Sequence, residues 1–286
     1  MVARLTGKGP TALLAGLLVA CSLPAAARDV LHSPWAETMH ARARLIAGRV
    51  EHQGRARSAA GVEIDIAGDW KTYWRTPGDA GGVPPVFDWS GSENLVRASV
   101  LFPAPKVMTD RAGNTIGYKG PVVLPVLIEA TDASRPVKLA LKLEYGVCRD
   151  ICIPAEASLA LALPPADEMP ASDALDQALM RVPRPQAALR PGDPVLQRAV
   201  AELKGARPRL VVEARFPGAS TAALVLAEAP DGLPIPLPRK TAERGDVLTF
   251  EADLSSGVDL ADLAGQTLQL TLIGGEGQSE AEMKVD

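Results

Sequence analysis

Two cysteines that lie close together, Cys148 and Cys152, are the most reactive feature of the sequence. They belong to the segment Tyr145–Pro154 (YGVCRDICIP). Oxidised, they close a ring of about five residues, which stabilises a fold by about 2 kcal/mol, whereas a bridge that closes ~60 residues gives roughly 4 kcal/mol. So tight a loop also strains a disulfide and raises its reduction potential. The spacing therefore predicts an exchangeable dithiol/disulfide pair, with a permanent structural disulfide as the alternative.

Metal binding is the second chemistry that these thiols offer. A structural zinc site needs four ligands. The histidines His32, His40 and His52 are spaced by eight and twelve residues, which fits no ligand pattern. We therefore expect no resident metal and interpret the histidines as ordinary exposed or packed residues. A soft Cu(I) ion held by the two thiolates is the alternative that stays open.

Hydrolytic chemistry has no motif to support it. The sequence contains no Gly-x-Ser-x-Gly elbow, no His-Glu-x-x-His pair and no glycine-rich phosphate loop. A cysteine nucleophile of the protease kind needs a histidine base. All the histidines lie near the N-terminal end, far along the chain from Cys148, so this class is disfavoured.

Composition and the N-terminal segment indicate an exported globular protein. The chain has 286 residues, of which 47% are hydrophobic and 22% charged, as in ordinary globular domains. Residues 1–27 have the pattern of a secretory signal, with Arg4 and Lys8 at the positive end, an apolar run over Thr11–Ala20 and a small-residue cleavage site at Ala25–Ala27. The run is shorter than the roughly 20 residues of a membrane-spanning helix. We therefore expect an envelope protein that is not integral to the membrane.

The same segment also fits a lipobox. Leu18–Cys21 (LVAC) resembles the motif in which the cysteine becomes the acylated first residue, so lipidation at Cys21 and cleavage after Ala27 both stay open. The formal net charge is −4, and removal of the leader makes it more negative. An acidic surface without a Lys/Arg stripe argues against nucleic acid as a partner.

Short segments of alternating apolar and polar residues, separated by turn residues, follow the leader. This pattern is typical of antiparallel sheets packed as a sandwich, so we expect an all-β fold. In Leu139–Tyr145 the apolar residues share one face at period two, and this strand leads directly into Cys148. The strands expected in this first part are Ala43–Ala47, Gly61–Ala67, Leu95–Leu101, Val122–Glu129, Val137–Tyr145 and Ala157–Leu163.

A proline-rich connector is expected over residues 166–206, because proline at this density stops strands and helices. Two short helices are expected within it, Ser172–Arg181 with Ser172 as N-cap, and Asp193–Leu203.

Residues 207–286 return to the strand rhythm and contain no Cys, His or Trp. They predict a second, smaller β-sandwich with a structural or adhesive role and no chemistry of its own. Its expected strands are Arg209–Arg215, Thr221–Ala227, Asp246–Ala252, Gln266–Ile273 and Glu280–Val285.

Three motifs in the first part carry a family resemblance. They are Gly68–Arg75 (GDWKTYWR), Asn114–Pro121 (NTIGYKGP) and Tyr145–Glu156 (YGVCRDICIPAE), of which the last is the most specific. Over residues 33–165 the sequence resembles the N-terminal periplasmic domain of the disulfide reductase DsbD and of its copper-tolerance relative ScsB. The resemblance implies an immunoglobulin-like sandwich that takes electrons from a membrane-embedded donor of the DsbD/CcdA type and passes them to thioredoxin-fold periplasmic proteins, without an organic cofactor.

By position, the resemblance makes Cys152 the attacking thiol and Cys148 its resolving partner. It also makes Thr115–Tyr118, which includes Ile116, the loop that caps the pair. The spacing departs from that of the best-known members, which place more residues between the cysteines. The chain shows neither electron-conducting membrane helices nor a terminal Cys-x-x-Cys domain, so we expect partners to supply both ends of the pathway.

Several side chains are expected around the sulfurs. Asp150, with Glu144, is an acidic neighbour that should raise the thiol pKa and keep the pair unreactive until a partner docks. Aromatic residues are expected to shield or support the sulfurs, with an ordinary place in the core as the alternative; they are Tyr73, Trp74, Tyr118 and Tyr145. The leading prediction is an electron relay. The alternatives are a copper-handling envelope protein that binds Cu(I) through the same thiols and a structural adaptor with a permanent disulfide.

Overall fold

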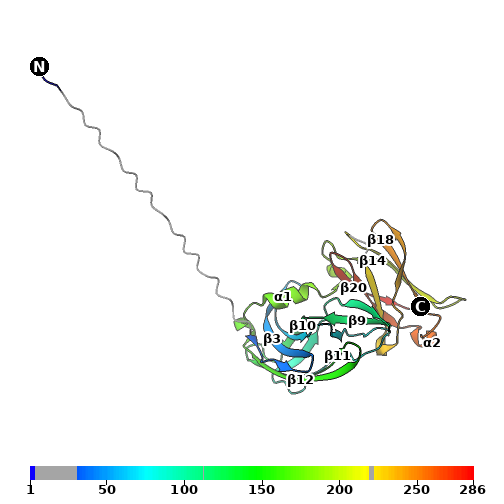
Figure 1. Ribbon diagram of the computed structural model, residues 1–286, viewed down its shortest axis with the longest axis horizontal. Helices are drawn as coiled ribbons and strands as arrows, with labels where there is room; N and C mark the ends of the chain where they lie inside the picture. Colours follow the sequence, from blue (N-terminus) through cyan, green and yellow to red (C-terminus); the bar gives the residue numbers. More distant parts are fainter. Residues whose placement is uncertain (4–30, 112, 219–221) are drawn as a thin grey trace.

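The computed structural model describes residues 1–3, 31–111, 113–218 and 222–286 (Figure 1). The predicted cleavage site and the lipobox cysteine Cys21 lie outside the described residues. In the part that is described, no helix has the length and hydropathy of a membrane span.

Two antiparallel sheets form the first sandwich, and its core lies between them. The first sheet has the order β1-β3-β4-β10-β7, with β2 paired to β3. Its strands are β1 (Leu31–His32), β2 (Ala36–Glu37), β3 (Ala41–His52), β4 (Arg55–Ile66), β7 (Leu95–Val100) and β10 (Val122–Ala130).

The second sheet carries the cysteines and has the order β12-β11-β5-β9-β8, with β6 paired to β11. Alternating burial along β11 shows which face of this sheet packs against the core. The odd-numbered residues from Val137 to Val147 are buried, whereas Lys138, Lys142 and Glu144 are exposed. The predicted immunoglobulin-like sandwich is confirmed. The strands of this sheet are β5 (Lys71–Tyr73), β6 (Val86–Asp88), β8 (Lys106–Asp110), β9 (Gly113–Lys119), β11 (Val137–Cys148) and β12 (Cys152–Leu163).

The helix α1 (Asp173–Met180) follows the first sandwich, as the sequence predicts. The Ser172 side chain accepts a hydrogen bond from the Leu175 backbone N–H and so caps the first turn. Leu175 is fully buried against Ile46, Val50 and Ala59 on the outer face of the first sheet. The helix is therefore packed onto the first sandwich.

The prediction of a helix over Asp193–Leu203 is wrong, because this segment forms the strand β14 (Val195–Glu202). Its register along β15 (Arg209–Arg215) shifts between Leu196 and Arg198. This bulge separates the inward residues Leu196 and Ala199 by three positions, a spacing that mimics a helix turn. Backbone pairing with β15 then decides the conformation in favour of a strand.

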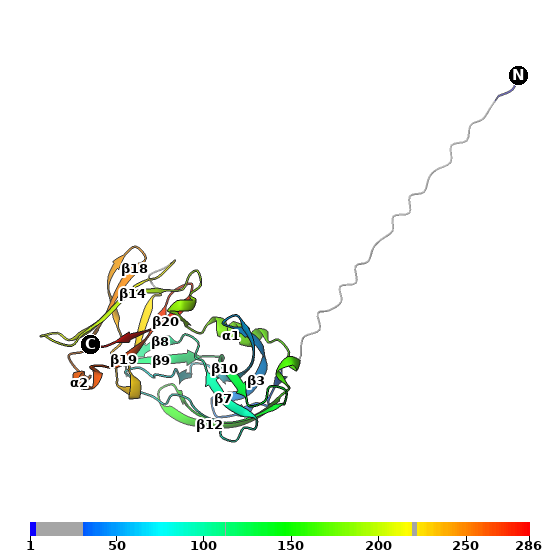
Figure 2. The same cartoon turned by 180° about the vertical axis from the view of Figure 1, so that it is seen from behind.

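The predicted second, smaller sandwich is confirmed as two four-stranded sheets around a separate core (Figures 1 and 2). Its sheets extend back into the proposed connector, since β13 and β14 both pair with later strands. A short helix, α2 (Leu260–Leu263), precedes β19. One sheet is β13 (Arg184–Pro185), β20 (Gln278–Lys284), β19 (Thr267–Ile273) and β16 (Leu224–Glu228); the other is β14, β15 (Arg209–Arg215), β18 (Val247–Asp253) and β17 (Arg239–Arg244).

Candidate functional site

The cysteines occupy the end of the β11–β12 hairpin. Cys148 is the last residue of β11 and Cys152 the first of β12, and the ladder pairs them directly. Direct cross-strand partners point to the same face of a sheet, and the two sulfurs form a disulfide. The backbone N–H of Arg149 donates to the Ile151 carbonyl at 3.0 Å, which closes the turn.

The two sulfur-bearing residues differ in exposure. Cys148 is 1% exposed, because β11 lies between β12 and β5 and Cys148 pairs with Lys71 on its other side. Cys152 is exposed on the edge strand β12, next to Ile151, which is 67% exposed at the tip of the turn. Cys152 is therefore the more exposed residue of the pair, and Cys148 is buried.

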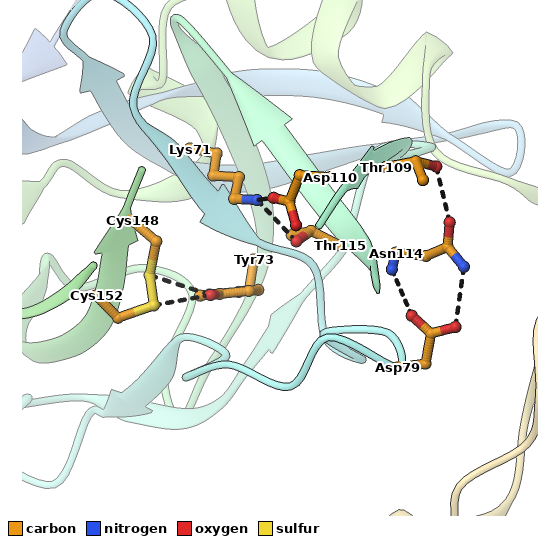
Figure 3. A network of polar contacts seen from close by, with 9 residues as sticks. All are labelled: Lys71, Tyr73, Asp79, Thr109, Asp110, Asn114, Thr115, Cys148 and Cys152. Atoms are coloured by element: carbon orange, nitrogen blue, oxygen red, sulfur yellow. Dashed lines mark hydrogen bonds and ion pairs between the residues drawn. A yellow bond between two sulfur atoms is a disulfide. The ribbon is translucent and has the colours of Figure 1, made fainter. Parts of the chain in front are cut away.

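Tyr73 places its hydroxyl group against both sulfurs (Figure 3). The phenol oxygen lies 3.1 Å from Cys148 Sγ and 3.0 Å from Cys152 Sγ. Disulfide sulfurs carry no hydrogen, so the phenol is the donor. Burial, with the Asp110 carboxylate as a smaller cause, raises the Tyr73 pKa above its ordinary value. The hydroxyl therefore keeps its proton at neutral pH.

Two glycines make room for the Tyr73 ring. A Cβ atom added at Gly82 would lie 2.2 Å from the ring, and one at Gly146 would lie 3.1 Å from it. The ring is thus enclosed between the hairpin and the segment of residues 76–85, which connects β5 to β6 and is called the cover segment below. The sequence alone indicates only a turn at Gly82 and not this contact with the Tyr73 ring.

The cover segment is attached to neighbouring strands. The Gly146 N–H donates to the Val83 carbonyl at 3.0 Å. The Asp79 carboxylate accepts hydrogen bonds from the backbone N–H and the side-chain amide of Asn114, whose amide oxygen accepts from Thr109 (Figure 3). These contacts hold the segment over the Tyr73 ring.

A buried lysine lies on the same face of the sheet as the sulfurs. Lys71 is two residues before Tyr73 and therefore shares its face. Its Nζ donates to Asp110 and to the Thr115 hydroxyl, both at 2.9 Å (Figure 3). No sequence motif singles out Lys71, although period-two alternation back from Tyr73 places it on the same face of the strand.

Aromatic stacking supports the turn between the cysteines. The Trp70 ring stacks on His40 at 3.8 Å between centroids, and the Arg149 guanidinium lies 5.4 Å from the Trp70 ring centroid. Arg149 also pairs with Asp150 at 3.0 Å, and both side chains are largely exposed. Asp150 is thus engaged with Arg149 at the surface of the turn.

Of the predicted shielding residues, the structure brings only Tyr73 to the sulfurs. Thr115–Tyr118 is part of strand β9 and not a capping loop. The Tyr118 hydroxyl donates to the Pro103 carbonyl at 2.7 Å, and burial raises the Tyr118 pKa well above its ordinary value. Neighbouring strand residues face opposite sides, which explains why four of the named residues lie in the core of the first sandwich: Trp74, Ile116, Tyr118 and Tyr145.

Metal ligands do not gather around the thiols. Within the described ranges, no group of three or more His, Cys, Asp or Glu side chains is arranged to hold a metal ion. A Cu(I) ion would have only the two thiolates, Cys148 and Cys152, and only after the disulfide is reduced.

The comparisons with known proteins agree with this geometry. Residues 45–164 match the family described as thiol:disulfide interchange protein DsbD, N-terminal. The match runs from β3 to the end of β12 and so includes both cysteines. The chain is also similar to the crystal structure of the N-terminal periplasmic domain of ScsB from Proteus mirabilis, with a TM-score of 0.68 and 21% identity, over 90% of this chain and 99% of that one. The likeness therefore extends over both sandwiches. The comparison with curated proteins finds no match.

Proposed function

We propose that this protein is a periplasmic thiol-disulfide relay that carries electrons between a membrane-embedded reductase of the DsbD/CcdA type and thioredoxin-fold envelope proteins. The observation that carries the proposal is the asymmetry of the disulfide. Cys152 is exposed, Cys148 is buried, and a phenol hydroxyl lies within hydrogen-bonding distance of both sulfurs.

Loading of the relay begins with a dithiol of the membrane partner. One partner thiolate attacks Cys152 Sγ, a mixed disulfide forms, and Cys148 leaves as a thiolate that takes up a proton. The second partner thiolate then attacks the partner sulfur of the mixed disulfide and releases the Cys152 thiolate. Two electrons enter the pair, and the partner leaves as a disulfide.

Unloading runs in the opposite sense. The Cys152 thiolate attacks the disulfide of a thioredoxin-fold protein, forming a mixed disulfide and expelling one partner thiolate. Cys148 then loses its proton, and its thiolate attacks Cys152 Sγ, which restores the internal disulfide and frees the second partner thiolate. Tyr73 donates its hydrogen bond to whichever thiolate develops beside it, because a charged acceptor strengthens that bond.

The trapping of a mixed disulfide tests the proposal. In Cys148→Ala the resolving thiol is absent, so a covalent complex with a thioredoxin-fold envelope protein should accumulate until reductant is added. Cys152→Ala should give none, because its remaining thiol is buried. Non-reducing electrophoresis and mass spectrometry of the band identify the partner.

The same experiment separates the alternatives. Equal trapping by both variants would refute the assigned roles of the thiols. No trapping by either would favour the structural bridge, or copper handling if the reduced protein binds Cu(I) in a titration that Cys152→Ala abolishes.

The periplasmic location is part of the proposal and rests on the sequence pattern of residues 1–27 and on the periplasmic domain named above. Mass spectrometry of protein recovered from the envelope should find an N-terminus near Arg28, or an acylated Cys21. An intact Met1 would contradict both forms of export.

A further inference from the structure

A bidentate ion pair joins the two sandwiches next to the sulfur site. Arg75 Nε lies 3.0 Å from both carboxylate oxygens of Glu228, and Arg75 Nη2 lies 2.7 Å from Glu228 Oε2. Thr76 also donates to Glu228, and the Arg75 guanidinium stacks 4.2 Å from the Trp74 ring centroid. The Glu228 side chain is only 12% exposed. The contact is therefore specific in geometry, and its carboxylate is largely shielded from solvent.

An apolar interface surrounds this ion pair. Along β16, Val225 is buried in the core of the second sandwich, whereas Leu226 is buried in the core of the first, with Leu224 packed against it. Ile273 on β19 also packs on the first core. Residues at period two along a strand share a face, so Glu228 lies on the same face of this sheet as Leu224 and Leu226, and this face packs against the first sandwich.

The chain runs directly from the sulfurs to this interface. Tyr73 contacts both sulfurs, Trp74 enters the core, and Arg75 reaches Glu228. Thr76, the first residue of the cover segment, is bound to the same carboxylate. Glu228 therefore holds the chain on the C-terminal side of Tyr73, at the point where the cover segment begins.

We infer that Glu228 of the second sandwich is a positioning residue for the redox pair, and that it acts through Tyr73. The inference rests on the proposed thiol-disulfide exchange and gives the second sandwich a part in that chemistry. With Glu228 in place, Arg75 and Thr76 are anchored and the phenol hydroxyl stays beside Cys152. Without it, the segment shifts and the hydrogen bond to the thiolate weakens.

A neighbouring carboxylate belongs to the same charge group. Burial raises the Glu280 pKa, Glu228 and Glu282 raise it further, and Arg75 opposes the shift. Glu280 is paired in register with Thr271, whose hydroxyl lies 3.3 Å from Arg75 Nη2. When Glu228 is neutralised, Arg75 is therefore free to turn toward Glu280, away from the position that anchors Tyr73.

The experiment compares Glu228→Gln, Tyr73→Phe and the double variant in the full chain, each in a Cys148→Ala background. Iodoacetamide alkylation of the Cys152 peptide is followed by mass spectrometry from pH 5 to 11. Glu228→Gln should slow alkylation at pH 7 by about two- to tenfold and move the midpoint of the pH profile upward, as Tyr73→Phe does. In the double variant, Glu228→Gln should add nothing to Tyr73→Phe.

Glu251→Gln is the matched control, since it removes the same charge from an ion pair with Arg209 on the other sheet of the second sandwich. It should leave the profile unchanged. An unchanged profile in Glu228→Gln, or additive effects in the double variant, would overturn the inference and leave the proposed exchange standing. A failure of the mixed-disulfide trap, with the Glu228→Gln shift present, would instead refute the proposed function alone.

Discussion

Removal of one oxygen atom, in Tyr73→Phe, tests whether the phenol controls the reactivity of Cys152. The ring stays, so its packing against Gly82 and Gly146 is kept, and only the hydroxyl at 3.0 and 3.1 Å from the sulfurs is lost. Tyr73 is 3% exposed, so water does not readily replace the donor. The change is therefore confined to the hydrogen bond.

The size of the effect follows from the energy of that bond. A hydrogen bond to a charged group contributes about 1.5–3 kcal/mol, which corresponds to roughly one to two pH units in the midpoint of thiolate formation. A thiolate formed at higher pH is a stronger nucleophile, with a Brønsted coefficient of about 0.4–0.5. Roughly half the loss is thus recovered, and alkylation at pH 7 should slow by about 3- to 15-fold.

The complete pH profile distinguishes this mechanism from a change in access. Loss of the hydrogen bond should lower the rate below the midpoint and raise the plateau above it, because the more basic thiolate reacts faster. A ring that merely blocked access would give a faster reaction at every pH once displaced. A profile that coincides with that of the parent protein would refute the role of the hydroxyl.

Three further predictions address the pair, its cover and the folding units. Replacing both Cys148 and Cys152 with Ser should lower the free energy of unfolding by about 2 kcal/mol or less, whereas a loss of about 4 kcal/mol would indicate a structural disulfide. The reduction potential of the pair should lie above about −300 mV. Gly82→Ala should reproduce the Tyr73→Phe profile, because its Cβ would lie 2.2 Å from the ring; an unaltered profile would show that the ring is free to move. A fragment ending at Pro183 should fold and keep the redox pair. A fragment ending at Leu163 should have a free energy of unfolding about 2 kcal/mol lower, since it loses the buried Leu175. Equal denaturant midpoints of the two fragments would contradict this prediction.

Strands along which burial alternates regularly could be predicted from the sequence, whereas β5, β6, β8, β9 and β17 were not among the expected strands. Leu139, Leu141 and Leu143 recur at period two and are buried in the structure, and the same rhythm leads into Cys148. The β14 segment was misassigned, because a bulge interrupts its alternation and only the partner strand β15 determines its pairing. Local patterns do not contain that information.

The site was predicted less completely than the fold. Tyr73 and Trp74 were both expected to shield the sulfurs, yet consecutive residues of a strand face opposite sides, so only one of them can do so. Choosing Tyr73 over Trp74 requires the pairing of β5 with β11, which is a long-range contact. The contact of Glu228 with Arg75 is likewise invisible in the sequence, since it joins positions 153 residues apart.

The short spacing between the cysteines is compatible with the proposed chemistry because of the hairpin register. Cys148 and Cys152 are direct cross-strand partners, and the next pairs, Val147 with Ile153 and Gly146 with Pro154, continue the same ladder. Reduction of the disulfide breaks one covalent bond and leaves these backbone pairs in place. The proposed exchange thus needs no refolding of the loop, and the main local change is the acceptor that Tyr73 meets, a neutral disulfide sulfur in one state and a thiolate in the other. In the proposed chemistry the hydroxyl therefore favours the reduced, ionised pair, and we expect a group that positions it, such as Glu228, to shift the balance between the two states.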